Sequence, residues 1–122
     1  MKDSRQLTPT DLENLCATIE ATPHKKIIIT HGTYTMTDST KYLQAQLKRR
    51  DQTIVFTGSM VPLSGFQSDA SDASFNMGYA LAKVDDLPAG VYLCMNGRVF
   101  NPDEAAKNLS EGKFFSVFDK QQ

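Results

Sequence analysis

In Lys26-Ile27-Ile28-Ile29-Thr30-His31-Gly32-Thr33-Tyr34-Thr35-Met36, a continuous apolar run gives way in one step to small polar residues. Apolar residues that follow one another without alternation predict a strand covered on both faces, as in a parallel sheet between helices. Gly32 lets the backbone turn and approach another group closely. Because ligands of open α/β sheets bind beyond the carboxyl ends of the strands, a functional site is expected at this turn.

The same alternation of strand and helix extends on both sides of this turn. A hydroxyl cap, a proline and an acid at 8–11 predict a helix that runs to about Ala21. A second helix is predicted from Thr37 or Asp38 to about Arg49. We therefore expect a three-layer α/β fold, with helices on both faces of a parallel sheet built from strands near 26–31, 53–58 and 91–96.

The C-terminal half is predicted from weaker patterns. A helix from about Ala73 to Val84 is apolar nearly all round and should be largely buried. From Gly97 onward the chain is polar and irregular, and a turn at 101–103 is predicted to lead into a short helix through Lys107. Three phenylalanines are expected to cover an exposed part of the sheet or to meet a second chain: Phe114, Phe115 and Phe118.

Length and composition bound the class of protein. A chain of 122 residues makes one domain, and its net charge of −1 carries no basic stripe for nucleic acid. No apolar run reaches the length of a membrane span and no signal segment opens the chain, so a cytoplasmic location is expected. Cys16 and Cys94 are expected to be reduced core residues, and His24 and His31 stand alone, so neither a metal nor a cofactor is predicted.

The turn also carries a family resemblance. His31-Gly32-Thr33-Tyr34-Thr35-Met36 resembles the His-Gly-Thr-Asp-Thr-Met signature of the L-asparaginase family, with tyrosine in place of the aspartate. Three further segments resemble family segments in the same order: Thr57-Gly58-Ser59-Met60-Val61-Pro62, Asp72-Ala73-Ser74-Phe75-Asn76 and Gly90-Val91-Tyr92-Leu93-Cys94-Met95-Asn96. The resemblance implies that residues 1–122 form one asparaginase-like N-terminal domain, incomplete at its N-terminal side.

The resemblance also implies an activity, the hydrolysis of L-asparagine to L-aspartate and ammonia. The family uses a threonine nucleophile from a Gly-Gly-Thr turn, which would lie upstream of Met1, and a second threonine and a lysine that fall on Thr33 and Lys107. Substrate-binding positions implied by the resemblance are Ser4, Gly32, Tyr34 and Ser59. Taken alone, Thr33 is an ordinary turn hydroxyl, Lys107 a solvated lysine and Ser4 an exposed terminal residue. His31 is interpreted as a hydrogen-bonded turn residue without a catalytic role.

Tyr34 makes the activity of this chain doubtful, because its phenol is neutral at pH 7 where the family has a carboxylate. The sequence thus favours an impaired or inactive asparaginase relative. The alternatives are a non-catalytic small-ligand or protein-interaction module and a nucleotide-binding domain, although no Gly-x-Gly-x-x-Gly or P-loop follows any predicted strand. The expected partners are a small amide or amino acid and further copies of the chain, since a missing upstream strand would leave a sheet edge uncovered.

Overall fold

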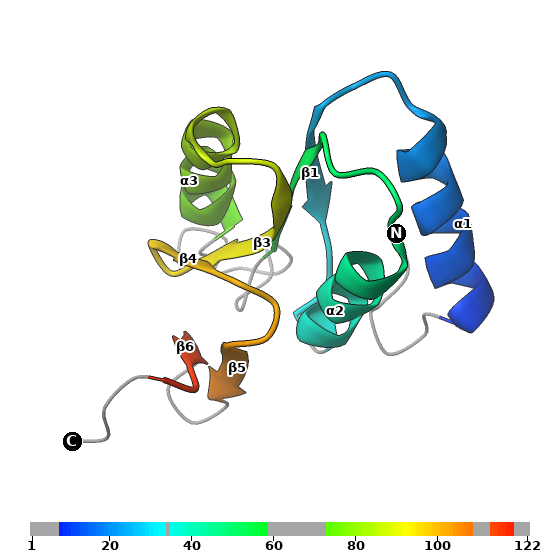
Figure 1. The fold of residues 1–122 in the computed structure, drawn as a ribbon. Coiled ribbons are helices and arrows are strands. Elements are labelled where there is room, and N and C mark those ends of the chain that lie inside the picture. The colour runs from blue at the N-terminus through cyan, green and yellow to red at the C-terminus, as the bar shows by residue number, and fades with distance from the viewer. Residues whose placement is uncertain (1–7, 34, 59–72, 109–112, 119–122) are drawn as a thin grey trace.

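The computed structural model describes residues 8–33, 35–58, 73–108 and 113–118. The helices and strands, in chain order, are α1 (Pro9–Ala21), β1 (Lys26–Thr30), α2 (Met36–Gln46), β2 (Thr53–Thr57), α3 (Ala73–Asp86), β3 (Gly90–Met95), β4 (Arg98–Phe100), β5 (Ala105–Asn108) and β6 (Lys113–Ser116) (Figure 1). The predicted order of helix, strand, helix and strand is therefore confirmed as far as β3.

The main sheet has the strand order β1-β2-β3-β4. β1 pairs in parallel with β2, and β2 pairs in parallel with β3, so that Ile28 lies beside Val55 and Val55 beside Tyr92. The predicted parallel sheet is confirmed. β4 extends it as an antiparallel strand, because Asn96 and Gly97 both have positive φ angles, 55° and 70°, and form the two-residue turn of a tight hairpin.

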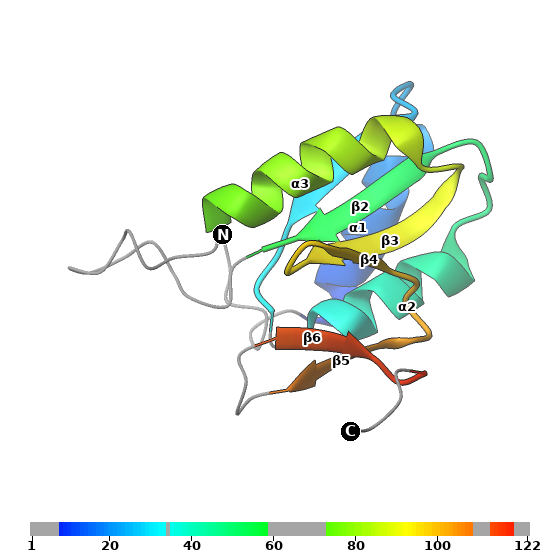
Figure 2. The same ribbon diagram turned by 90° about the vertical axis from the view of Figure 1, so that its left-hand side faces the viewer.

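Helices cover both faces of the sheet (Figures 1 and 2). α1 and α2 lie on one face, and α3 lies on the other. The larger core, on the face of α1 and α2, consists of Ile19, Met36, Leu43, Leu47, Ile54, Phe56, Val91, Leu93, Met95, Phe100, Ala105 and Phe114. The smaller core, under α3, consists of Val55, Ala80, Val84 and Cys94. The three consecutive apolar residues of β2 thus serve both cores, and all five residues of the strand are buried.

The helix boundaries agree with the sequence at the start of α1 and differ in α2. Thr8 caps α1 as predicted: its hydroxyl accepts from the Asp11 N–H at 3.2 Å, and its own N–H donates to the Asp11 carboxylate at 2.9 Å. α2 begins at Met36, before the predicted cap, and ends at Gln46 instead of near Arg49. The buried side chain of Met36 draws the start of the helix into the larger core.

The prediction that α3 is largely buried is wrong. Phe75 is 60% exposed and Leu81 is 55% exposed, although Val84 on the same helix is buried. The reason is that α3 packs with one side on the sheet, while the opposite side meets no other helix or strand among the described residues. Phe75 instead stacks on Tyr79 within the helix, with 6.3 Å between ring centroids.

The predicted short helix through Lys107 is also wrong. Ala105–Asn108 forms β5, which pairs antiparallel with β6 and places Lys107 opposite Phe114 in the backbone ladder. The buried Phe114 ring lies 6.5 Å from the Phe100 ring, which joins this hairpin to the larger core. Of the three C-terminal phenylalanines, Phe114 covers the sheet as expected, whereas Phe118 is 77% exposed and the side chain of Phe115 lies outside the description. Contact of Phe118 with a second chain stays a prediction.

None of the helices in the described ranges combines the length and apolar character that crossing a membrane would require.

Candidate functional site

The candidate site lies at the carboxyl ends of the parallel strands. β1 is followed by His31, β2 by Gly58 and β3 by Asn96, and parallel pairing brings these three ends to one edge of the sheet. The His31 N–H donates to the Thr57 carbonyl at 2.9 Å, which continues the pairing of β1 and β2 by one residue. The first residue of the turn predicted from the sequence is therefore held by a backbone hydrogen bond to β2.

Glycine is required at position 58 by the closeness of the neighbouring chain. A Cβ atom added there would lie 2.2 Å from the His31 carbonyl oxygen and 3.0 Å from the terminal methyl carbon of Met36. The first distance is far below van der Waals contact, and a backbone oxygen cannot swing aside as a side chain can. Gly58 thus allows the end of β2 to lie against the turn after β1.

Asn76, in the first turns of α3, connects the ends of two strands. Its side chain is fully buried; its Nδ2 donates to the Gly58 carbonyl at 2.9 Å, and its Oδ1 accepts from the Asn96 N–H at 3.0 Å. Asn96 in turn accepts through Oδ1 from the Phe114 N–H at 2.9 Å. One continuous set of hydrogen bonds therefore holds β2, β3, α3 and the β5–β6 hairpin together at this edge.

The buried imidazole of His31 holds the turn through two hydrogen bonds. It is 8% exposed, its Nδ1 lies 2.5 Å from the Gly32 carbonyl oxygen, and its Nε2 lies 2.9 Å from the Ser39 hydroxyl. Because a carbonyl can only accept, Nδ1 carries the proton, and Nε2 accepts from Ser39. Burial lowers the pKa of His31, and the hydrogen bond to Gly32 opposes this only in part, so the ring is neutral at pH 7. These contacts agree with the interpretation of His31 as a hydrogen-bonded turn residue.

The structure describes only some of the residues predicted to form the site. Gly32 and Thr33 follow His31 directly and are half-buried. Ser4, Tyr34 and Ser59 lie outside the described residues. The Lys107 backbone pairs with Phe114, whose N–H binds Asn96, but its side chain lies outside the description. A common pocket for Thr33 and Lys107 therefore remains a prediction.

The supporting roles of Asn76, Asn96 and Ser39 do not follow from the motifs of the sequence. Asn76 and Asn96 belong to segments that resemble the family, and Ser39 belongs to none of them. The usable signal for Asn76 was a lone amide in an otherwise apolar helical pattern, because a buried amide must find hydrogen-bond partners.

The described residues contain neither an activated thiol nor a ready metal site. Burial raises the pKa of Cys94 to about 11, although Lys83 lowers it, so this side chain is a neutral thiol at pH 7. Burial and the nearby Glu20 carboxylate also raise the pKa of Cys16. Across residues 8–33, 35–58, 73–108 and 113–118, no three His, Cys, Asp or Glu side chains are grouped so that they could hold a metal ion.

The burial of His31 predicts a pH dependence of stability. The pKa of His31 in the folded chain lies below its ordinary value of about 6.5, so the unfolded chain binds more protons as the pH falls below that value. The free energy of unfolding should therefore fall from pH 7 to pH 5, and the fall should be smaller in His31→Gln. Urea denaturation at both pH values measures this.

The exposed His24 supplies the matched control for this experiment. His24→Gln should keep the pH dependence of the wild type. If His31→Gln and the wild type lost equal stability between pH 7 and pH 5, the buried neutral imidazole would not be the cause.

Comparison with known proteins assigns the chain to a family. The family model described as "Asparaginase, N-terminal" matches residues 1–120. A search of curated proteins finds no match. The matched region includes all the strands and helices described above, together with the turn at His31-Gly32-Thr33. The chain belongs to the asparaginase family and forms an N-terminal domain of that family.

Proposed function

We propose that this chain binds a small amide or amino acid at the carboxyl edge of its sheet, and that residues 1–122 by themselves hydrolyse amides slowly or not at all. One observation carries the proposal. The family turn is retained and held by the buried His31, yet the residue after Thr33 is a neutral tyrosine where the family has aspartate. Such a turn can still bind a ligand at the edge of the sheet, but it lacks the carboxylate charge that amide hydrolysis in the family needs.

Amide hydrolysis needs a nucleophile, a base that accepts its proton and donors that stabilise the oxyanion. Thr33 is the candidate hydroxyl within the turn. His31 is a poor candidate base, because its Nδ1–H is bonded to Gly32 and its Nε2 accepts from Ser39. Lys107 is the remaining candidate from the family resemblance. Its ammonium group has no lone pair, so it could act as a base only after it had given up a proton to a nearby carboxylate.

Tyr34 cannot supply that carboxylate. Removal of a charged partner of this kind typically costs a few kcal/mol, which corresponds to roughly two or more decades in rate or affinity. In addition, the printed 122 residues contain no Gly-Gly-Thr sequence. Full activity of the family type would therefore require a threonine from another segment or another chain, besides a carboxylate near position 34.

An ammonia-release assay tests the catalytic half of the proposal. Residues 1–122 and the Thr33→Ala variant should both release ammonia from L-asparagine and L-glutamine only at the uncatalysed rate. Turnover well above background that disappears in Thr33→Ala would contradict the proposal, because it would make Thr33 a working nucleophile despite Tyr34.

A binding experiment tests the ligand half. Tyr34→Asp should bind L-asparagine more tightly by roughly tenfold, because the new carboxylate can pair with the α-ammonium group. Succinamate, which is asparagine without the α-amino group, should gain nothing. Isothermal titration of the wild type and Tyr34→Asp with both ligands measures the difference.

Tyr34→Phe is the matched control, since it removes the hydroxyl and adds no charge. It should leave the preference between the two ligands unchanged. Equal gains for asparagine and succinamate in Tyr34→Asp, or the absence of binding in every variant, would exclude an amino acid at this turn and favour a protein-interaction role.

A further inference from the structure

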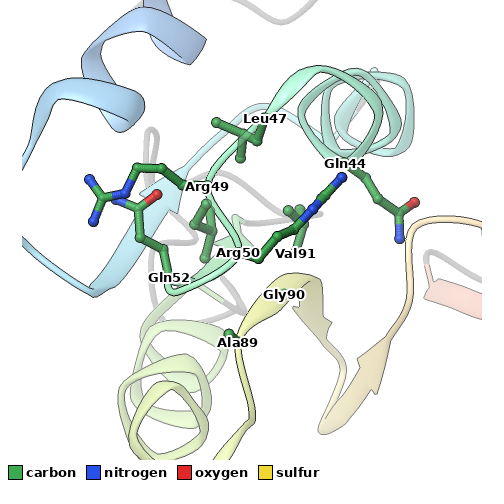
Figure 3. Close-up of a pocket in the computed structure, with 9 residues that line it drawn as sticks. Gln44, Leu47, Arg49, Arg50, Gln52, Ala89, Gly90 and Val91 are labelled. Carbon is green, nitrogen blue, oxygen red and sulfur yellow. The ribbon is translucent and has the colours of Figure 1, made fainter.

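A cavity of about 190 Å³ lies at the opposite end of the parallel strands from the candidate site, between the segment that leads into β2 and the beginning of β3 (Figure 3). Arg49 in its wall is already bound to the Asp51 carboxylate, with two hydrogen bonds of 3.0 Å. The side-chain oxygen of Gln52 is buried beyond the reach of a ligand. Among the described lining residues, the exposed Arg50 is the remaining charged group, and one exposed charge does not define a binding site.

The outward side of α3 is a surface that neither the fold nor the candidate site explains. Figure 2 shows α3 with one side against the sheet. Exposed residues recur on the other side at spacings of three and four, and no residue between positions 74 and 82 is charged. A contiguous uncharged surface with large apolar side chains indicates a contact with another molecule. We call it the α3 strip, and it consists of Ser74, Phe75, Gly78, Leu81 and Ala82.

Gly78 forms a notch in the middle of the α3 strip. A Cβ atom added there would meet nothing within 4 Å, whereas Phe75 and Leu81, three residues before and after it, are 60% and 55% exposed. The Phe75 ring stacks on Tyr79 and lies beside Gly97, where an added Cβ atom would be 3.4 Å from the ring. An aromatic side chain that is already held in place loses little conformational freedom when a partner covers it.

We propose that the α3 strip packs against the α3 strip of a second copy of this chain, with the two helices antiparallel and crossing at Gly78. Residues about equally far before and after the crossing then come opposite one another. Phe75 lies beside the partner's Ala82, and Leu81 lies beside the partner's Ser74, so that each large side chain meets a small one. Glycine at the crossing lets the two backbones approach. The strip is therefore complementary to itself, as a two-fold contact requires.

The charges of α3 favour an antiparallel second copy. The acidic residues Asp85 and Asp86 lie in the last turn, where the helix dipole is also negative, although Lys26 pairs with Asp85 at 3.1 Å. In an antiparallel pair this end lies near the positive N-terminal end of the partner helix. The two Asp85 residues stay about 20 Å apart, beyond the screening length of about 8 Å. A parallel pair would instead bring four carboxylates together.

The size of the α3 strip predicts a weak dimer. With 14 residues, α3 is about 21 Å long and about 10 Å wide. Such a footprint is well below the roughly 800 Å² that each partner buries in a standard stable interface. We therefore expect a dissociation constant on the order of 0.1 mM, so that the dimer forms only at high concentration. This contact is independent of the ligand proposed for the carboxyl edge.

Sedimentation velocity of residues 1–122 between about 20 μM and about 1 mM should show reversible exchange between monomer and dimer. Ala82→Gln puts a longer polar side chain where the partner's Phe75 would lie, so the dissociation constant should rise at least about tenfold. Ala17→Gln makes the same change at an exposed position of α1, on the other face of the sheet, and should keep the association within about twofold of the wild type. A monomer at about 1 mM, or equal association of the two variants, would overturn the proposal.

Disulfide trapping tests the crossing point and the direction of the helices. The background is Cys16→Ser, in which the remaining Cys94 is buried. Gly78→Cys should form covalent dimers under mild oxidation, because the two new thiols meet at the crossing. Asp85→Cys should form none, because its copies lie about 20 Å apart and a disulfide needs Cα atoms within about 7 Å. The antiparallel contact is refuted if position 78 does not cross-link, or if position 85 cross-links equally well.

Discussion

The close approach of two backbones at Gly58 is the constraint on which the described edge of the sheet depends. The His31 carbonyl oxygen lies 2.2 Å from the place where a Cβ atom of residue 58 would be. With glycine there, β2 can end against the turn after β1, and the Gly58 carbonyl can receive the Asn76 amide. Asn76 then fixes Asn96, and Asn96 fixes the β6 backbone. A buried network whose members are all bonded holds one geometry, because every departure leaves a polar group without a partner.

The two edges of the sheet differ in how their polar groups are satisfied. At the carboxyl edge, the side chains of His31, Asn76 and Asn96 all have protein partners, which suits a rigid support for a ligand-binding turn. At the amino edge, the side-chain oxygen Oε1 of Gln52 is buried and has no partner within the described residues.

Local patterns in the sequence predicted those features of the fold that depend on neighbouring residues alone. The unalternating isoleucines of β1 gave the parallel sheet, and the cap at Thr8 gave the start of α1. The exposure of Phe75 and Leu81 was not predictable from α3 itself, because an apolar residue on each side of a helix does not say which side meets the sheet. β4 does have a local signal in the sequence, because the pair Asn96-Gly97 is typical of a two-residue hairpin turn. The β5–β6 hairpin joins the larger core through the contact between Phe100 and Phe114. These two residues lie far apart in the sequence, so no local pattern predicts their contact.

The site was predicted less completely than the fold for a related reason. The turn at His31-Gly32-Thr33 follows a strand, so its place at the sheet edge could be inferred. The residues that hold it, Asn76 and Ser39, come from helices, and a single buried polar residue in a helix has no periodic signature. The predicted meeting of Thr33 and Lys107 rests on the family resemblance, and the ammonia and binding assays decide it.

Amide hydrogen exchange in Gly58→Ala and Gly78→Ala tests most directly whether Gly58 holds the strand ends together. A Cβ atom at Gly78 would meet nothing within 4 Å, so Gly78→Ala should keep or slightly raise stability. Gly58→Ala should lower the free energy of unfolding by about 1–3 kcal/mol, and the amides of His31 and Asn96 should exchange faster together. If Gly58→Ala kept the wild-type stability and the protection of both amides, the central role of this close approach would be contradicted.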